Sequence, residues 1–538
     1  AIWARLETAT CHIITMSLAM QLLVGWAFSW AHWVLAESKC QDFTTEDDAT
    51  CVLALGSSLW LTRPRYRIAY IASSFYPDGK PSAWGRVDKN AVTIALDDAR
   101  QGDWCDSKCE LDLPPELIFE ANGTVDEALL AFVQRAVQTG VVAILGADWS
   151  RVADAVDSEL RRLNVSLPLM SSGSTTGSFD SAATHPNFLR TVYSDSDGVR
   201  ALLADLVARQ GAAENNTNDT GSLAVIASRE PYGTGCANNA KDAVSWGGPK
   251  VIAEATFESG ENVSAIRSHV REVIEQARSL RQSQPMVLVC ATGPDTTTVM
   301  HALAAEGMLG PPRGTWVVGA VEASASVVHS KVDIDVAEGY ISYLADPSLA
   351  ADPSSAECPA VRDFGIRFEN SFGEKPGGGY ALFSYDLVVL TAAALRFATI
   401  SAFPDAPSTA PSSRRPGGAE LLAAIRSPDF AVQGLTGLLS FRSNENQPCT
   451  PHLLVVLQLL PGAGVGTASD NFVQALVATI SHEGVGSCPT SQYPVGALFP
   501  QNVTEMTCGG VAFAGITLTC PASEQNRNAC PGKYQQDS

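Results

Sequence analysis

The stretch that decides the fold is residues 141–195, VVAILGADWSRVADAVDSELRRLNVSLPLMSSGSTTGSFDSAATHPNFLRTVYSD. Its first five residues, 141–145, are apolar and mostly β-branched, which predicts a buried strand. Apolar residues then recur at helical spacing from residue 152 to residue 163. Pro168 stops that pattern, and residues 167–170 begin a second strand. The stretch therefore predicts a strand–helix–strand unit with a polar loop after each strand.

These two polar loops read GADWS at 146–150 and SSGSTT at 171–176. Open α/β sheets bind ligands outside the carboxyl ends of their strands. Hydroxyl and backbone N–H groups there can hold a small anion such as a carboxylate, with Ser150 and Thr175 as expected contacts and Ser174 in support. Serine and threonine also cap helices and fill loops, which explains either loop alone. Two such loops on consecutive strands favour a ligand site.

The pattern ILG…S.VADAV…LPLMSSGSTT…FLRTVYSD resembles the first half of the bilobed receptor-family ligand-binding region. That family includes bacterial branched-chain amino-acid binding proteins, natriuretic-peptide receptor ectodomains and the Venus-flytrap domains of class C G-protein-coupled receptors. The resemblance runs from about residue 66 to about residue 460. Its most specific pieces are RT..SD at 190–195 and PYG at 231–233.

The strand–helix alternation continues on both sides of the central stretch, which predicts mainly parallel sheets with helices on both faces. This alternation and the family resemblance together lead us to expect an α/β fold with two doubly wound parallel-sheet lobes. Such a fold is called type I periplasmic-binding-protein-like. Three chain crossings would make a hinge between the lobes, and a small Cys-rich C-terminal appendix would follow. The expected divisions are a leader (1–36), a Cys-bearing lead-in (37–65), lobe I (66–195 and 341–434), lobe II (196–340), closing strands and connector (435–485) and the appendix (486–538).

Three more local expectations complete this architecture. Residues 339–344 are expected to cross back to the first lobe. Residues 435–441 and 453–460 are expected to pair as terminal strands. Residues 404–418 are rich in proline, serine and glycine and predict a surface insertion.

Composition narrows the class of protein. The chain has 538 residues, 46% of them hydrophobic and 17% charged, which suits a large folded core. A formal net charge of -21 argues against binding nucleic acid or anionic lipid. The thirteen cysteines show no paired CxxC spacing, so no zinc site is predicted. Several Asn-x-Ser/Thr sequons favour an oxidising, extracellular setting: Asn122, Asn164, Asn215, Asn218, Asn262 and Asn502.

The N-terminal region contains an apolar run at residues 16–36 that resembles a signal peptide cleaved near Ala36. The alternative is an uncleaved signal anchor, because residues 12–36 are long enough to span a bilayer.

Cys105 and Cys109 are expected to form disulfides locally or with cysteines of the lead-in, and the sequence leaves these choices open.

No catalytic motif emerges. The GSTTG run at 173–177 places Thr175 where a nucleophile elbow needs serine. The eight histidines stand outside HExxH or HxH contexts, and no Walker lysine is present. No nucleophile, base and oxyanion hole can be assembled. The sequence therefore predicts a protein that is not an enzyme, with no cofactor and no metal ligands.

The resemblance implies a ligand site shared by the two lobes. In amino-acid-sensing members of the family, loop hydroxyls hold the ligand carboxylate, and Ser150 and Thr175 match those positions. Asp195, Tyr232 and an acid after a later strand, matched by Glu322, would hold the ammonium. Each has an ordinary alternative: Asp195 can cap a helix, Tyr232 can pack in the hinge, and Glu322 can be solvated.

The predicted function is the extracellular ligand-binding domain of a membrane receptor that closes around a small polar ligand such as an amino acid. The resemblance also implies a homodimer through lobe I. Membrane attachment would come from a downstream segment or an N-terminal anchor, and the protein would lie on the extracellular face of the plasma membrane or be secreted. The alternatives are a secreted or periplasmic-type binding protein for transport and a structural module that binds no ligand.

Overall fold

The computed structural model describes residues 65–76, 79–102, 104, 110–214, 221–280, 285–310, 313–321, 334–337, 339–344, 359–376, 380–402, 415–448, 453–461 and 472–481. All of them belong to one compact unit, Arg65–Ser538. The predicted leader, the lead-in up to residue 64, Cys105, Cys109 and the Cys-rich appendix lie outside the described residues.

The first lobe is built on a parallel sheet with strand order β2-β1-β4-β5-β6, in which β3 pairs with the second half of β1. Its strands are β1 (Arg65–Ala72), β2 (Glu110–Asp112), β3 (Ile118–Glu120), β4 (Ala143–Gly146), β5 (Leu169–Ser171) and β6 (Phe188–Arg190). The helices of this lobe are α3 (Ala83–Gln101), α4 (Glu127–Gln138), α5 (Ser150–Arg162), α13 (Pro359–Phe372), α14 (Tyr380–Ala402) and α15 (Gly418–Ile425).

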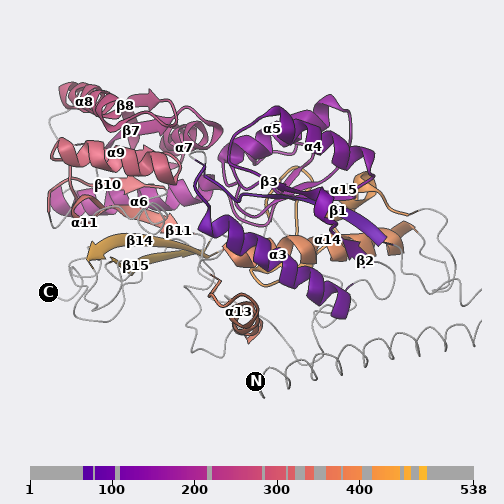
Figure 1. Ribbon diagram of the computed structural model, residues 1–538. Coiled ribbons are helices and arrows are strands. Elements are labelled where there is room, and N and C mark those ends of the chain that lie inside the picture. Colours follow the sequence, from indigo (N-terminus) through magenta and orange to yellow (C-terminus); the bar gives the residue numbers. More distant parts are fainter. Residues whose placement is uncertain are drawn as a thin grey trace, which may run out of the picture. The chain divides into compact units, whose positions relative to one another are not determined.

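Successive side chains of β1 enter two different cores, because a strand presents alternate residues to opposite faces. Ile68 and Tyr70 pack in a cluster with residues of α3 and α14. Ala69 and Ile71 pack in a second cluster with residues of α4 and α5. Figure 1 shows α4 and α5 above these strands and α3 and α14 below them. The sheet is therefore covered on both faces, as the sequence predicts.

The second lobe has a seven-stranded sheet in the order β15-β14-β11-β10-β9-β7-β8. The parallel strands are β7 (Ser222–Ser228), β8 (Lys250–Phe257), β9 (Met286–Cys290), β10 (Val318–Ala320) and β11 (Ile341–Leu344). Two antiparallel strands, β14 (Leu453–Pro461) and β15 (Phe472–Ser481), extend one edge. The helices are α6 (Asp195–Glu214), α7 (Pro231–Asp242), α8 (Val263–Leu280), α9 (Gly293–Ala305) and the short α11 (Ile334–Ala337).

This second sheet is also covered on both faces. Leu223 and Val225 of β7 pack with residues of α6 and α7. Ala224 and Ile226 of the same strand pack with residues of α8 and α9. The two doubly wound lobes that the β-α alternation predicts are therefore confirmed.

Two details of the predicted architecture are wrong. Residues 341–344 do not cross to the first lobe: they form β11, which pairs with β10 and β14 in the second sheet. Residues 435–441 do not pair with 453–460. Instead β12 (Val432–Gly434) and β13 (Gly437–Leu439) form a separate hairpin, and β14 pairs with β11 and β15. Strand pairing is decided by distant partners, which local periodicity does not identify.

The chain passes between the two sheets three times, as predicted. It leaves the first sheet between β6 and α6, returns between β11 and α13, and leaves again between β13 and β14. Three neighbouring connections of this kind are the usual construction of a hinge between two lobes.

One helix of the described residues is long and apolar enough to cross a membrane, the Tyr380–Thr399 part of α14. Its most apolar window is 89% buried inside the protein. A helix that is apolar all round is expected in the core of a large domain. We therefore describe α14 as the central core helix of the first lobe, packed against α3.

Candidate functional site

The two polar loops predicted at the carboxyl ends of β4 and β5 lie together, and Asp148 joins them. Its Oδ1 accepts hydrogen bonds from the Ser171 hydroxyl at 3.0 Å and from the backbone N–H of Gly173 at 2.9 Å. It also accepts from both the N–H and the hydroxyl of Ser172, each at 3.0 Å. Asp148 is buried, so these bonds fix the second loop relative to the first.

Two of the predicted hydroxyl residues, Ser150 and Ser174, come together in the loops that Asp148 joins. The Ser174 hydroxyl donates to the Ser150 hydroxyl at 3.3 Å, and both side chains are buried. Ser150 is the first residue of α5, and Trp149 at the N-cap position supplies no side-chain acceptor. The first N–H groups of an α-helix have no partners within the helix and favour an anion. This corner of the first lobe is therefore chemically suited to a carboxylate.

Thr175 connects the same loop to the hinge. Its carbonyl oxygen accepts a hydrogen bond from the Asp195 N–H at 2.7 Å. Its hydroxyl also hydrogen-bonds the Asp195 carboxyl group, which lowers the pKa of that group and partly offsets the effect of burial. The predicted residues Ser150, Ser174, Thr175 and Asp195 are thus brought into one continuous region of the protein.

The side chain of Asp195 forms a hydrogen bond inside the hinge. It begins α6, is 1% exposed, and accepts a hydrogen bond at 2.5 Å from the hydroxyl of Tyr343 in β11. The bond joins two of the three connections between the lobes. Burial raises the pKa of Asp195 to about 6, although the bonds from Tyr343 and Thr175 lower it.

Arg190, which belongs to the RT..SD motif, supports the loop after β5 from behind. Its guanidinium is fully buried and donates to the carbonyl oxygens of Thr176 at 3.0 Å and Ser174 at 3.4 Å. It also pairs with the carboxylate of Asp180 and donates to Gln447 at 3.3 Å. A planar guanidinium can satisfy several acceptors at once. Arg190 therefore holds the shape of the loop that carries the predicted contacts.

Arg151 of the first lobe and Glu230 of the second lobe form a pair of opposite charges, which the sequence analysis did not identify. Nε of Arg151 in α5 lies 3.9 Å from Oε2 of Glu230, which precedes α7. The buried Nε and one NH2 group of Arg151 make no hydrogen bond within the described part of the chain. Burial raises the pKa of Glu230, and the charge of Arg151 opposes that rise. The Nε and Nη2 groups of Arg151 can therefore donate hydrogen bonds to a further acceptor.

Direct contacts between the lobes surround this pair. The Thr176 hydroxyl donates to the carbonyl oxygen of Pro231 at 3.0 Å. Within the second lobe, the Ser196 hydroxyl at the start of α6 donates to the Asn239 side chain at 3.2 Å, and a Cβ added at Gly177 of the first lobe would lie 2.5 Å from that hydroxyl oxygen. A Cβ added at Gly235 would lie only 2.1 Å from the Thr176 hydroxyl oxygen. Only glycine lets α7 approach the loop this closely.

The two predicted residues of the second lobe have different outcomes. Tyr232 lies in α7, is 7% exposed and packs in the core cluster of that lobe. A disulfide between Cys236 and Cys290, with Cα atoms 5.6 Å apart, ties α7 to β9. Glu322 lies outside the described residues, and its neighbour Val321 is buried.

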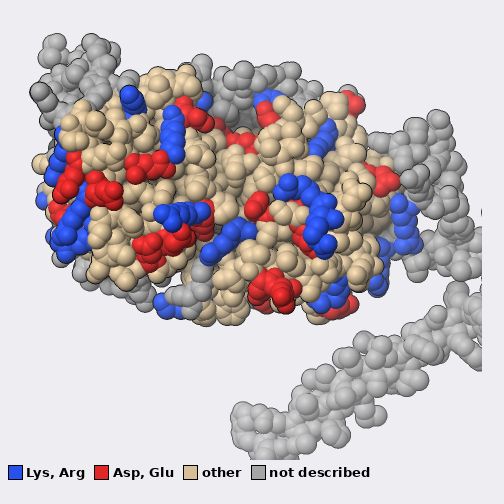
Figure 2. Space-filling view, turned by 90° about the horizontal axis from the view of Figure 1, so that it is seen from above, with Lys and Arg blue, Asp and Glu red and all other residues tan. Residues whose placement is uncertain are grey.

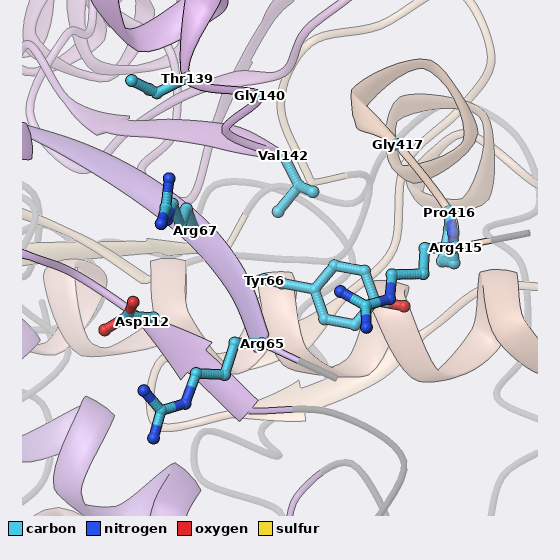
Figure 3. A pocket seen from close by; sticks show the side chains of 10 residues that line it. All are labelled: Arg65, Tyr66, Arg67, Asp112, Thr139, Gly140, Val142, Arg415, Pro416 and Gly417. Atoms are coloured by element: carbon cyan, nitrogen blue, oxygen red, sulfur yellow. The ribbon is translucent and has the colours of Figure 1, made fainter. Parts of the chain in front are cut away.

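A separate pocket of about 440 Å³ lies at the other end of the first sheet. Arg65, Tyr66 and Arg67 from the start of β1 line it, together with Asp112, Val142 and Arg415 among others (Figure 3). The predicted ligand loops follow the carboxyl ends of the strands, whereas this pocket is at their amino ends. We therefore keep it apart from the candidate site.

On the face that Figure 2 shows, the described residues form no continuous basic patch. Figure 2 shows Lys and Arg side chains interspersed with Asp and Glu side chains over the visible described surface. A strongly basic continuous patch would be needed to hold nucleic acid or anionic lipid. The visible face therefore agrees with the inference drawn from net charge.

A hinged pair of doubly wound lobes, with polar loops at the carboxyl ends of its strands, has the architecture of bilobed solute-binding proteins. The chain belongs to the periplasmic binding protein family, whose model matches residues 76–462. No curated protein matches the sequence.

Solved structures of similar fold include periplasmic and solute-binding proteins. One is a periplasmic binding protein from Burkholderia mallei, with a TM-score of 0.56, 13% identity and coverage of 80% of this chain and 97% of that one. Another is the Leucine-, isoleucine-, valine-, threonine-, and alanine-binding protein of Brucella ovis in a closed conformation (TM-score 0.54, 16% identity, coverage 79% and 98%). A third is a solute-binding protein of an ABC transporter from Rhodopseudomonas palustris in complex with 3,4-dihydroxy benzoic acid (TM-score 0.52, 14% identity, coverage 78% and 97%).

Proposed function

We propose that this protein binds a small organic carboxylate between its two lobes and serves outside the cytoplasm as a solute-binding protein for transport. The observation that carries the proposal is the Arg151–Glu230 pair, which brings one charged side chain from each lobe together beside the Ser150–Ser174 hydroxyls. The comparisons favour this role, the second of the sequence-based hypotheses, over the receptor ectodomain. The periplasmic binding protein family supports a location in an extracellular or periplasmic space.

The ligand class follows from the donors on the first lobe. Arg151 has unused N–H groups, Ser150 has a hydroxyl group, and the amino end of α5 attracts negative charge. The guanidinium of Arg151 can donate two parallel hydrogen bonds, and the Ser150 hydroxyl and the first N–H groups of α5 can donate others. Proteins recognise carboxylates with donors of this kind. The relatives from Brucella ovis and Rhodopseudomonas palustris support this class, because amino acids and 3,4-dihydroxybenzoic acid all contain a carboxyl group.

The second lobe would decide what lies at the other end of the ligand. Glu230 offers a buried carboxylate that an ammonium group could neutralise. An amino acid would then pair its carboxylate with Arg151 and its ammonium with Glu230. An aromatic acid has no cation for Glu230, so the carboxylate of Glu230 would compete with the ligand for Arg151.

Binding would act on the hinge through the same residues. A ligand closes two lobes only if it binds the closed state more tightly than the open state. Contacts from Arg151 on one lobe and Glu230 on the other meet that condition, because both can touch one small molecule only when the lobes approach. Closure would present a ligand-specific surface to a membrane partner.

The test is a thermal-shift screen of the purified protein against leucine, benzoate, 3,4-dihydroxybenzoate and a wider set of amino acids and small organic acids. A ligand at 100 times its Kd should stabilise the fold by roughly 2.7 kcal/mol. We expect Arg151→Gln to abolish the shift and Arg161→Gln, an exposed arginine of the same helix, to retain it. A well-folded sample that no compound shifts would contradict the proposal.

A second variant separates the two ligand classes. If the ligand is an amino acid, Glu230→Gln removes the partner of the ammonium and weakens binding. If the ligand is a simple acid, Glu230→Gln removes the competitor for Arg151 and strengthens binding. The receptor hypothesis is tested separately, by asking whether the chain in its native cells copurifies with a transport permease or with a signalling membrane protein.

A further inference from the structure

Four aromatic side chains form a row beside the carboxyl ends of β1 and β4. Trp149, which follows β4, packs edge to face against Tyr76, with ring centroids 6.0 Å apart, and against Trp84, at 5.2 Å. Trp84 also contacts Tyr380, at 6.3 Å. Tyr76 and Trp84 follow β1, which pairs with β4, and Tyr380 begins α14. We call Tyr76, Trp149, Trp84 and Tyr380 the aromatic row.

The aromatic row connects the candidate site to the hinge. Trp149 immediately precedes Ser150 and Arg151, the residues proposed above to hold a carboxylate. At the other end of the row, Tyr380 packs against the core cluster that contains Tyr343 of the hinge. A ligand bound at the start of α5 would therefore have the row beside it on the first lobe.

Most of the row retains surface that a bound molecule can cover. Tyr76, Trp84 and Tyr380 are partly exposed, whereas Trp149 is 8% exposed. Large aromatic rings contribute most to a folded protein or a complex when they are fully buried. Three partly exposed rings in contact with one another, next to a polar site, therefore favour an apolar group of a ligand as the missing cover.

Trp149 has two features that local stability does not explain. It stands at the N-cap of α5, where Ser, Thr, Asp and Asn are preferred, and its side chain caps no N–H group there. Its buried indole N–H makes no hydrogen bond within the part of the chain that the structure describes. Buried indole N–H groups usually have a partner. A ligand carboxylate at the start of α5 would bring acceptor oxygens to both groups of unpaired donors.

The charge beside the row decides which apolar group it suits. Aromatic faces attract cations as well as other rings. Here the next charged residue along the chain is Arg151, and the amino end of α5 carries partial positive charge. Both would repel an ammonium group placed against Trp149. An uncharged aromatic ring meets no such repulsion and can extend the edge-to-face and tilted contacts of the row.

We propose, on the basis of the proposed function, that the ligand is an aromatic carboxylate: its carboxyl group binds at Ser150 and Arg151, and its ring packs against the aromatic row. Trp84 is the central specificity residue, because it contacts both Trp149 and Tyr380 and is itself partly exposed. An aromatic pair adds to binding beyond the area that it buries, which corresponds to a roughly 2- to 10-fold preference over a saturated ring.

The experiment compares matched aromatic and saturated compounds on the purified full chain by calorimetry and tryptophan fluorescence. The pairs are benzoate with cyclohexanecarboxylate, phenylalanine with cyclohexylalanine, and the uncharged benzyl alcohol with cyclohexylmethanol. We expect the aromatic member of a binding pair to bind roughly 2–10 times more tightly. Trp84→Leu should remove this preference. Phe397→Leu is the matched control and should retain it, because Phe397 is also partly buried and packs against another ring, Phe430, near the far end of α14.

The outcomes separate this proposal from the proposed function. If the acids bind but the saturated compounds bind as tightly as the aromatic ones, the aromatic row is not the ligand contact and the carboxylate site stands. The same conclusion follows if folded Trp84→Leu keeps the preference. If no acid binds, the carboxylate site fails and the alcohols decide: a preference for benzyl alcohol that Trp84→Leu removes supports the aromatic row, and equal or absent binding of both alcohols overturns it.

Discussion

The contact between α7 and the loop after β5 gives a sharp test of how closely the lobes approach. Replacing Gly235 by alanine would place a methyl group 2.1 Å from the Thr176 hydroxyl oxygen, whereas ordinary contact begins at 3.4 Å. The structure can respond in two ways. Either Thr176 rotates and loses its 3.0 Å bond to Pro231, or α7 moves away by about 1.3 Å, the gap between those two distances.

Each response has a definite free-energy cost. Losing the Thr176 hydrogen bond costs about 1 kcal/mol. Forcing an extra methyl group into a packed contact costs roughly 1–3 kcal/mol. The closed arrangement should therefore lose about 1–3 kcal/mol relative to an open one. Alanine also favours helix by about 0.5–1 kcal/mol over glycine, but that gain applies equally to both arrangements of the lobes.

The assay is hydrogen–deuterium exchange read by mass spectrometry on peptides that cover residues 174–178 and 231–236. A cost of about 2 kcal/mol corresponds to exchange roughly 30 times faster wherever protection requires the lobes to be in contact. Gly365→Ala is the matched control, because this glycine lies in α13 with nothing within 4 Å of the added Cβ. If Gly235→Ala leaves exchange unchanged and stabilises the protein as much as Gly365→Ala does, the contact between the lobes is refuted.

Three further predictions concern stability measured by urea unfolding. Asp195→Asn should stabilise the protein by up to roughly 3 kcal/mol at pH 7. Burial raises the pKa of Asp195 from 3.8 to about 6, so protonation of this group adds stability that is complete below pH 3.8 and is lost as the pH rises through about 6. A difference from wild type that does not grow with pH would contradict this. Arg190→Met should cost about 3–5 kcal/mol by leaving buried acceptors unpaired, and a loss below 1 kcal/mol would be inconsistent with the structure. Replacing Cys236 and Cys290 by alanine should cost roughly 4 kcal/mol, since the disulfide spans 54 residues, and insensitivity of the wild type to reductant would argue against it.

The alternating pattern made the two lobes predictable from sequence. Strands such as β4 and β9 are short apolar runs, and helices such as α5 and α8 repeat their apolar residues at helical spacing, so local periodicity contains the information. The covered faces follow directly, because strands such as β4 are buried throughout. The alternation of strands and helices along the chain and the covered sheets could therefore be expected without knowing any long-range contact.

The edge of the second sheet could not be predicted in the same way. Residues 341–344 form β11, and it is their pairing with β10 and β14 that assigns them to the second lobe. Strand β15 pairs with β14 antiparallel, and its residues show no feature that names this partner. Partner choice depends on packing between segments that are distant in sequence.

The candidate site was predictable only in part for a similar reason. Ser150 and Ser174 were expected together because the carboxyl ends of neighbouring parallel strands meet at one edge of a sheet. Arg151 and Glu230 are ordinary charged residues beside helix starts, and tertiary structure alone brings them to 3.9 Å. Asp195 matched a ligand residue by resemblance, yet its carboxylate accepts a hydrogen bond from Tyr343 in the hinge, a contact between residues 148 positions apart.

The central claim is that one small carboxylate binds beside Arg151 between the lobes. Isothermal titration calorimetry with the strongest compound from the thermal-shift screen tests this most directly. We predict one site per chain and a negative heat-capacity change, with binding weakened by about 1.5–3 kcal/mol in Arg151→Gln and retained in Arg161→Gln. Equal affinity in the wild type and Arg151→Gln would contradict the claim and place the ligand elsewhere on the protein.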